Sequence, residues 1–162
     1  MDMPADKKFK VLCEITRASH FEWLRAVSKL APELDLDKLV RQYWHEVGLD
    51  TAKAYLPHLD KDKPLPEQVA RSFAFSSTCM GEDCQVKPGK DDKEFFAEHH
   101  GCPWFDWHKR EDKLEQDRMG CDAWLGAVVE GVNESLGTSL KCETLKSLPD
   151  GDEVCLRRFW VE

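Results

Sequence analysis

Residues 98–122 read EHHGCPWFDWHKREDKLEQDRMGCD, and this stretch decides how the chain is organised. Pro103 fixes its own φ angle and disfavours the helical region for the residue before it, so Cys102 is predicted at a bend between two elements. Side chains at such bends are available to ligands because the flanking elements hold them still. The stretch therefore predicts a junction in the fold and a candidate site, with buried thiols and satisfied histidines in an ordinary core as the alternative.

Two amphipathic helices are predicted on the N-terminal side of this stretch. Apolar residues recur there at three- and four-residue steps, which is the period of one helix face. The first helix covers about residues 8–30 and ends at Pro32. The second begins at an N-cap, Asp35 or Asp37, and stops before Pro57.

The pattern then changes to alternation, which predicts strands. Phe73 and Phe75 alternate with small polar residues, Cys84 and Val86 continue the alternation beyond a turn, and residues 94–100 form a third run. Short turns join the three runs. We therefore expect an antiparallel three-strand meander that ends at the bend.

The C-terminal part predicts one more helix and a hairpin. The helix begins near Glu111 or Asp112 and ends at Gly137, a natural C-cap. Residues 139–147 and 153–161 flank the Asp150-Gly151 turn signal. The predicted fold class is α+β, with a mostly antiparallel sheet of about five strands, the meander plus the C-terminal hairpin, packed against three longer helices.

Composition limits the functions that are open to the chain. A length of 162 residues predicts a single domain over residues 1–162. The net charge of −8, with basic residues interleaved among acidic ones, argues against nucleic-acid binding. There is no long apolar run and the N-terminus lacks the apolar core of a signal peptide, so we expect a cytoplasmic protein without a membrane span. Seven cysteines without an export signal predict reduced thiols.

The first candidate chemistry is a thiol nucleophile at Cys102. A cysteine becomes reactive when a neighbouring base or cation lowers its pKa. His100 precedes Cys102 on the same predicted side of the strand, and His108 follows it. Asp122 or Glu98 is the candidate carboxylate that orients the histidine.

The second candidate is a metal site. Cys79, Cys84, Cys102 and Cys121 could supply four thiolates to zinc or an iron–sulfur cluster. Their spacing does not match the paired Cys-x-x-Cys knuckles of typical zinc sites. A mixed zinc site built from Cys102, His108 and Cys121 is a further version of this alternative.

The third candidate is a pocket that binds a small molecule without catalysis. Trp104, Trp107 and Trp124 would form its apolar wall, and Arg157 or Arg158 could bind a carboxylate. The alternative is that these tryptophans fill the core of the domain.

Three short motifs carry a resemblance to a known family. They are Cys102-Pro103, the Cys121-Asp122 step in the following helix, and Gly151-Asp152-Glu-Val-Cys155 in the final hairpin. From about residue 72 to the C-terminus the chain resembles the L-2-amino-thiazoline-4-carboxylic acid hydrolase-like proteins. Its Gly-Asp-x-x-Cys ending is also similar to that of 4-vinyl-reductase-type sensor domains, which bind small molecules.

The first resemblance implies hydrolytic opening of a cyclic C=N bond in a small heterocycle. The attacking group would be the Cys102 thiolate, or a water activated by a histidine or a bound metal. His100 or His108 would protonate the leaving atom, Asp122 would orient the histidine, and Arg158 would hold the substrate carboxylate. This hydrolase prediction names no cofactor. The alternative is a non-catalytic small-molecule or redox sensor or carrier with zinc or an iron–sulfur cluster on its cysteines. Self-association into a homo-oligomer stays open.

Overall fold

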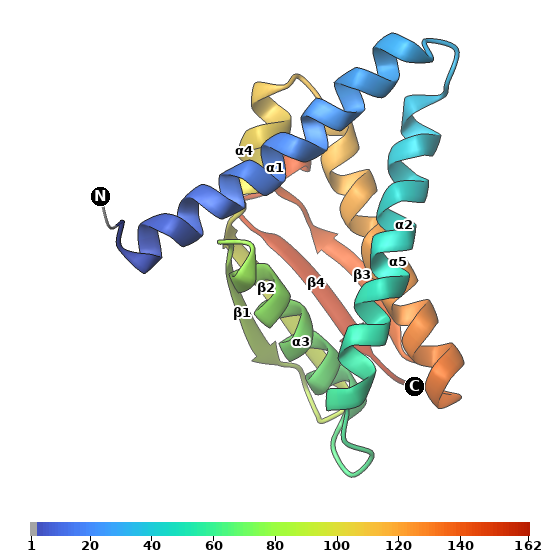
Figure 1. The fold of residues 1–162 in the computed structure, drawn as a ribbon. Helices are drawn as coiled ribbons and strands as arrows, with labels where there is room; N and C mark the ends of the chain where they lie inside the picture. Colours follow the sequence, from blue (N-terminus) through green and yellow to red (C-terminus); the bar gives the residue numbers. More distant parts are fainter. Residues whose placement is uncertain (1–2) are drawn as a thin grey trace.

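The computed structural model describes residues 3–162, and they fold into helices packed on one antiparallel sheet (Figure 1). Within the described residues, no helix is both long and apolar enough to cross a membrane. The elements, in chain order, are α1 (Ala5–Leu30), α2 (Leu36–Tyr55), the 3₁₀ turn η1 (Leu56–His58), α3 (Leu65–Cys79), β1 (Asp83–Pro88), β2 (Glu94–Gly101), α4 (Pro103–Arg110), α5 (Leu114–Leu136), β3 (Lys141–Lys146), the 3₁₀ turn η2 (Leu148–Asp150) and β4 (Cys155–Trp160).

The sheet has four strands in the order β1-β2-β4-β3, and every neighbouring pair is antiparallel. The α+β class is confirmed, but the expectation of about five strands is too high by one. The prediction of a strand at Phe73 and Phe75 is wrong, because this segment belongs to α3. Phe73 is only 4% exposed, whereas Phe75 is 69% exposed. The buried set is Val69, Ala70, Phe73 and Ser77, which has helical spacing.

The helices lie on one face of the sheet. In β4 the side chains of Cys155, Arg157 and Phe159 are buried against them, and the residues between are less buried. Figure 1 shows α3 lying across the sheet and α2 running alongside α5.

Helices α2 and α5 approach each other closely at Gly48. A Cβ atom built there would lie 2.4 Å from the carbonyl oxygen of Trp124 and 2.6 Å from the Cβ of Ala127. Glycine is needed at this position because any side chain would meet backbone of α5. The crossing holds Trp124 of α5 against the hydrophobic core between the helices and the sheet.

The bend predicted at Cys102 is present, and a short helix follows it. Cys102 has extended backbone angles, φ −130° and ψ 101°, and Pro103 opens α4. This helix was not predicted, because its eight residues are too few to show a clear period. Gly137 ends α5 in the left-handed conformation, with φ 65°, as a C-cap glycine does.

Helix α1 is buried only along part of its length. Its N-terminal part projects beyond the sheet (Figure 1). The apolar side chains of Val11, Leu12 and Ile15 are exposed there, whereas Phe21 and Leu24 are buried further along. The buried part of α1 packs against α2 through His20 and Trp44, and against α4 through Phe21 and Trp107.

Candidate functional site

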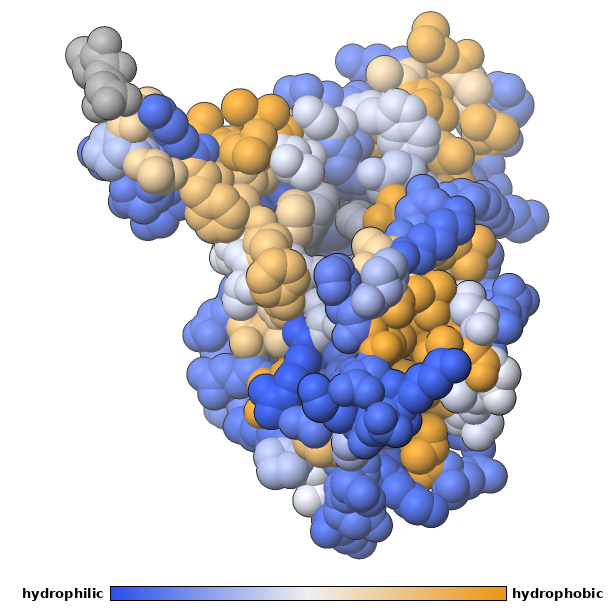
Figure 2. Space-filling model, turned by 60° about the horizontal axis from the view of Figure 1, so that its bottom comes forward, coloured by the Kyte–Doolittle hydropathy of each residue, from blue (hydrophilic) through white to orange (hydrophobic). Residues whose placement is uncertain are grey.

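A cavity of about 790 Å³ lies among α1, α2, α3, the start of α5 and the sheet. Figure 2 shows a hollow in the molecular surface beside α1. Aromatic side chains supply much of the cavity wall. They include Trp23, Tyr43, Trp44, Phe73, Trp104 and Trp124.

The aromatic wall is continuous from the surface inward. The ring centres of Trp23 and Tyr43 are 5.4 Å apart, those of Tyr43 and Trp44 are 5.3 Å apart, and those of Trp44 and Trp104 are 5.4 Å apart. These separations are typical of packed aromatic pairs. Trp23 is 40% exposed, so the wall starts at solvent.

His108 lies at the inner end of this wall. Its Nδ1 donates a hydrogen bond to the carbonyl oxygen of Trp104, at 2.9 Å. Its Nε2 is buried and has no hydrogen-bond partner among residues 3–162. Burial lowers the pKa of His108, so the ring is neutral near pH 7 and Nε2 carries a lone pair. A neutral imidazole oriented in this way is suited to accept a proton.

Asp117 lies beside His108. Its Oδ1 is 3.8 Å from His108 Nδ1, and its buried Oδ2 has no partner in the described part of the chain. Burial raises the pKa of Asp117 to about 7, with Arg157 opposing that rise. The carboxyl group is therefore present in both protonation states near neutral pH, which suits proton transfer.

A second polar group faces the cavity from β2. His99 Nε2 lies 2.9 Å from Ser77 Oγ and 3.0 Å from Glu82 Oε2. Ser77 comes from the last turn of α3, and Glu82 precedes β1. The three side chains satisfy one another and line the cavity together.

Arg157 supplies a buried cation to the same cavity. Its residue surface is 3% exposed, and its Nη1 donates to the carbonyl oxygen of Lys146 at 3.1 Å. A buried guanidinium favours an anionic partner, and carboxylates fit its planar donor geometry.

Cys102 and Cys121 are held in the neutral thiol form by their surroundings. Burial raises the pKa of Cys102 well above its usual range and that of Cys121 to about 12. Both line the cavity, as does Cys79, whereas Cys84 does not. Across residues 3–162, no three or more His, Cys, Asp or Glu side chains are grouped so that they could hold a metal ion. The four-cysteine metal site therefore finds no support in the structure.

Some of the predicted site residues meet at this cavity. Cys102, His108, Trp104 and Trp124 all line it. They come from the Cys-Pro bend, from α4 and from α5.

Four of the residues predicted for catalysis or substrate binding do not line the cavity. His100 is paired with Glu98 at 2.6 Å, Trp107 donates to Glu14 Oε2 at 3.0 Å, and Asp122 accepts from Thr144 and Arg118. Arg158 is ion-paired with Glu94 and Glu143 on the opposite face of the sheet from Arg157.

The family model for L-2-amino-thiazoline-4-carboxylic acid hydrolase matches residues 13–159. The chain belongs to the L-2-amino-thiazoline-4-carboxylic acid hydrolase family. The predicted resemblance is thereby confirmed. No curated protein matches the sequence.

Solved structures share the fold of this hydrolase-family chain at low sequence identity. Trafficking protein particle complex subunit 3 from Naegleria fowleri, covalently bound to palmitic acid, is similar with a TM-score of 0.61 and 16% identity, over 94% of this chain and 96% of that one. The phenol-responsive sensory domain of the transcription activator PoxR with phenol gives a TM-score of 0.54 and 12% identity, over 89% of this chain and 73% of that one. The second likeness agrees with the weaker resemblance to sensor domains.

Sequence reasoning missed Asp117 in this family member, although a signal for it exists. Asp117 lies four residues before Cys121 and eight before Leu125, so it is on the buried stripe of α5. A carboxylate on an apolar stripe is an indication of a functional group. His20 gives a similar signal on α1, where it is buried, and its Nδ1 has no partner among the described residues.

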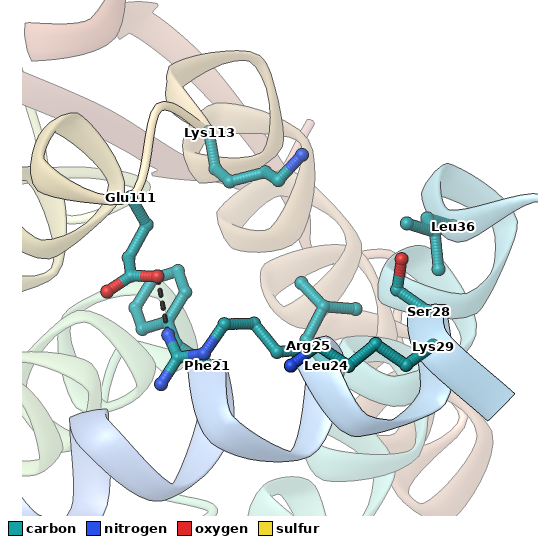
Figure 3. Close-up of a pocket in the computed structure, with 8 residues that line it drawn as sticks. All are labelled: Phe21, Leu24, Arg25, Ser28, Lys29, Leu36, Glu111 and Lys113. Carbon is teal, nitrogen blue, oxygen red and sulfur yellow. Dashed lines mark hydrogen bonds and ion pairs between the residues drawn. The ribbon is translucent and has the colours of Figure 1, made fainter. Parts of the chain in front are cut away.

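A smaller cavity of about 150 Å³ lies between α1 and the turn after α4 (Figure 3). Arg25 reaches Glu111 across it, with 2.5 Å between Nη1 and Oε2. These charged groups are partnered and partly exposed, so they do not resemble the unpartnered buried groups of the larger cavity. The larger cavity is therefore the candidate site.

Proposed function

We propose that the chain is a small-molecule hydrolase that opens a cyclic C=N bond in the large cavity. The observation that carries the proposal is His108, whose Nε2 is an unpartnered, buried proton acceptor at the cavity. Membership of the hydrolase family supports the reaction class. L-2-amino-thiazoline-4-carboxylic acid is the first compound to test.

Water, rather than a thiolate, is the nucleophile in this proposal. Burial raises the pKa of Cys102, which makes its thiolate costly to form near pH 7. His108 needs no such activation, because its neutral form already holds the lone pair. The sequence-based hypothesis of attack by Cys102 is therefore replaced by its alternative, an activated water.

The reaction divides into two balanced steps. His108 Nε2 takes a proton from water while the water oxygen bonds to the ring carbon, and the C=N electron pair moves to nitrogen, which takes the proton of neutral Asp117. The tetrahedral carbon then forms a carbonyl and breaks its bond to a ring heteroatom. That heteroatom receives the proton held by His108, and the hydroxyl proton returns to Asp117. The net change is the addition of one water.

Arg157 is the residue that we assign to the substrate carboxylate. It lines the cavity, whereas Arg158, the other sequence-based candidate, is engaged with Glu94 and Glu143. Trp104 and Trp124 form apolar walls on which a flat ring can pack. His99 and Glu82 face the same space and offer acceptors for ring or amino N–H groups.

The test compares His108→Gln with His100→Gln. Ring opening of L-2-amino-thiazoline-4-carboxylic acid is followed by mass spectrometry as the addition of one water. Loss of a general base lowers the rate by about 10²–10⁴-fold, so we expect this loss for His108→Gln. His100→Gln is the matched control, because His100 is paired with Glu98 outside the cavity. Equal rates for both variants would overturn the proposal.

The second candidate function is binding of a small molecule without catalysis. The aromatic wall from Trp23 to Trp104 favours it, since such a surface binds apolar ligands without any chemistry. The PoxR sensory domain, which carries phenol, has the same fold. Saturable binding of phenol by the wild-type protein, with no ring opening of any cyclic amidine tested, would favour this candidate.

A further inference from the structure

The cavity is much larger than the head group that the proposed chemistry needs. Its volume of about 790 Å³ lies in the upper part of the ~300–1,000 Å³ range that holds drug-sized ligands. A single five-membered ring with an amino group and a carboxylate fills only a small part of such a space. Most of the volume is therefore available to another portion of the ligand.

The two ends of the cavity differ in chemistry. The ionisable groups His108, Asp117 and Arg157 belong to α4, α5 and β4, which form the inner end. The aromatic wall leads from Trp104, whose carbonyl oxygen binds His108, outward through Trp44 and Tyr43 to the exposed Trp23. The apolar side chains of Ile15, Val47 and Phe75 also line the cavity, and Val47 is one helical turn after Tyr43 on α2.

We infer that the substrates are amphipathic: an anionic ring head group at His108, Asp117 and Arg157 carries one large alkyl or aryl substituent, which lies along the aromatic wall towards Trp23. The inference rests on the proposed function for the position of the head group. The buried atoms of His108 and Asp117 that have no partner within residues 3–162 favour a polar ligand group at the inner end. The continuous ring contacts make the rest of the path mainly aromatic. His20 packs against Tyr43, Trp44 and Trp104 on this path, and burial lowers its pKa to about 4, so it adds no charge there near pH 7.

The test measures binding without turnover. Butanoate, octanoate and dodecanoate, kept below their micelle-forming concentrations, are titrated into the full chain and followed by calorimetry and tryptophan fluorescence. Each methylene that becomes fully buried raises affinity by about fourfold. We therefore expect octanoate to bind at least about tenfold more tightly than butanoate. An affinity that does not depend on chain length would overturn the inference.

Two variants separate the cavity from the exposed apolar surface. Val47→Trp fills cavity space beside the aromatic wall, one helical turn from Tyr43, so octanoate should lose at least about tenfold in affinity while butanoate changes less than about twofold. Val47→Phe repeats the test with a smaller side chain if the Trp variant does not fold. Leu12→Ala is the control, because Leu12 is 61% exposed and does not line the cavity. Loss of octanoate binding in Leu12→Ala but not in the Val47 variants would show adsorption to the surface and overturn the inference.

The outcomes also separate this inference from the proposed function. Chain-length-dependent binding that persists in His108→Gln, with no ring opening by the wild type, supports the amphipathic ligand and removes the hydrolase. Ring opening that depends on His108, with no dependence of affinity on chain length, keeps the hydrolase and removes the amphipathic ligand.

Discussion

The buried carboxyl of Asp117 makes a prediction about stability against pH. Its pKa is raised from 3.8 to about 7, with burial as the main cause. Between these two values the folded chain binds more protons than the unfolded chain. Stability therefore falls as the pH rises through this window, and the full cost is present above about pH 7.

The magnitude follows from the two pKa values. At about 1.4 kcal/mol for each pH unit, the difference between 3.8 and about 7 corresponds to about 4 kcal/mol. Asp117→Asn keeps the shape of the side chain and removes the titration. We expect this variant to match the wild type near pH 4 and to exceed its free energy of unfolding by up to about 4 kcal/mol at pH 8.

The assay is urea unfolding followed by far-ultraviolet circular dichroism at pH 5, 6, 7 and 8. Subtracting the wild type from Asp117→Asn cancels the titration of groups that the substitution does not touch. Asp106→Asn is the control, because it makes the same chemical change at an exposed position on α4. A stability difference for Asp117→Asn that stays flat between pH 5 and 8, or that falls with pH, would refute the reasoning.

Two other predictions concern packing and thiol reactivity. Gly48→Ala should destabilise the fold by about 1–3 kcal/mol in the same urea assay, because its Cβ would meet backbone of α5. Gly126→Ala is the control: nothing lies within 4 Å of a Cβ there, so this variant should be neutral or stabilising by up to about 1 kcal/mol. A larger loss of stability in Gly126→Ala than in Gly48→Ala would contradict the close helix crossing. Iodoacetamide labelling mapped by mass spectrometry at pH 8 should modify Cys102 more slowly than the exposed Cys79, because burial raises the pKa of Cys102 and limits access to it. Faster labelling of Cys102 would restore the thiolate mechanism.

The elements with clear local signals could be predicted from the sequence. α1, α2, α5 and the C-terminal hairpin follow from apolar periodicity, caps and the Asp150-Gly151 turn. α3 could not be separated from a strand at Phe73 and Phe75, because two phenylalanines two residues apart fit alternation as well as they fit a helix with one exposed ring. Only the packing of α3 on the sheet decides between the two.

The candidate site was predictable as a region, but not residue by residue. Alternation separates His99 from His100 and Arg157 from Arg158, yet the sequence does not say which member of each pair faces the helices. A register slip of one residue exchanges them. The structure has His99 and Arg157 at the cavity, while His100 and Arg158 form ion pairs elsewhere. The Cys102 bend and His108 did fall in the predicted stretch, because Pro103 fixes the local backbone there.

The energetic cost of Asp117 bears on the choice between hydrolysis and simple binding. A cavity that only held an apolar ligand would gain stability if this buried carboxyl were replaced by an apolar side chain of similar volume. The same is true of the unpartnered His108 Nε2 beside it. Two adjacent groups that are costly to bury, a neutral imidazole with a free lone pair and a carboxyl whose pKa is about 7, have an explanation if they transfer protons to and from a ligand. We expect Asp117→Asn to gain the predicted stability at pH 8 and to lose ring opening while octanoate still binds. That result would tie the stability cost of burying Asp117 to the chemistry of the head group and not to the apolar part of the cavity.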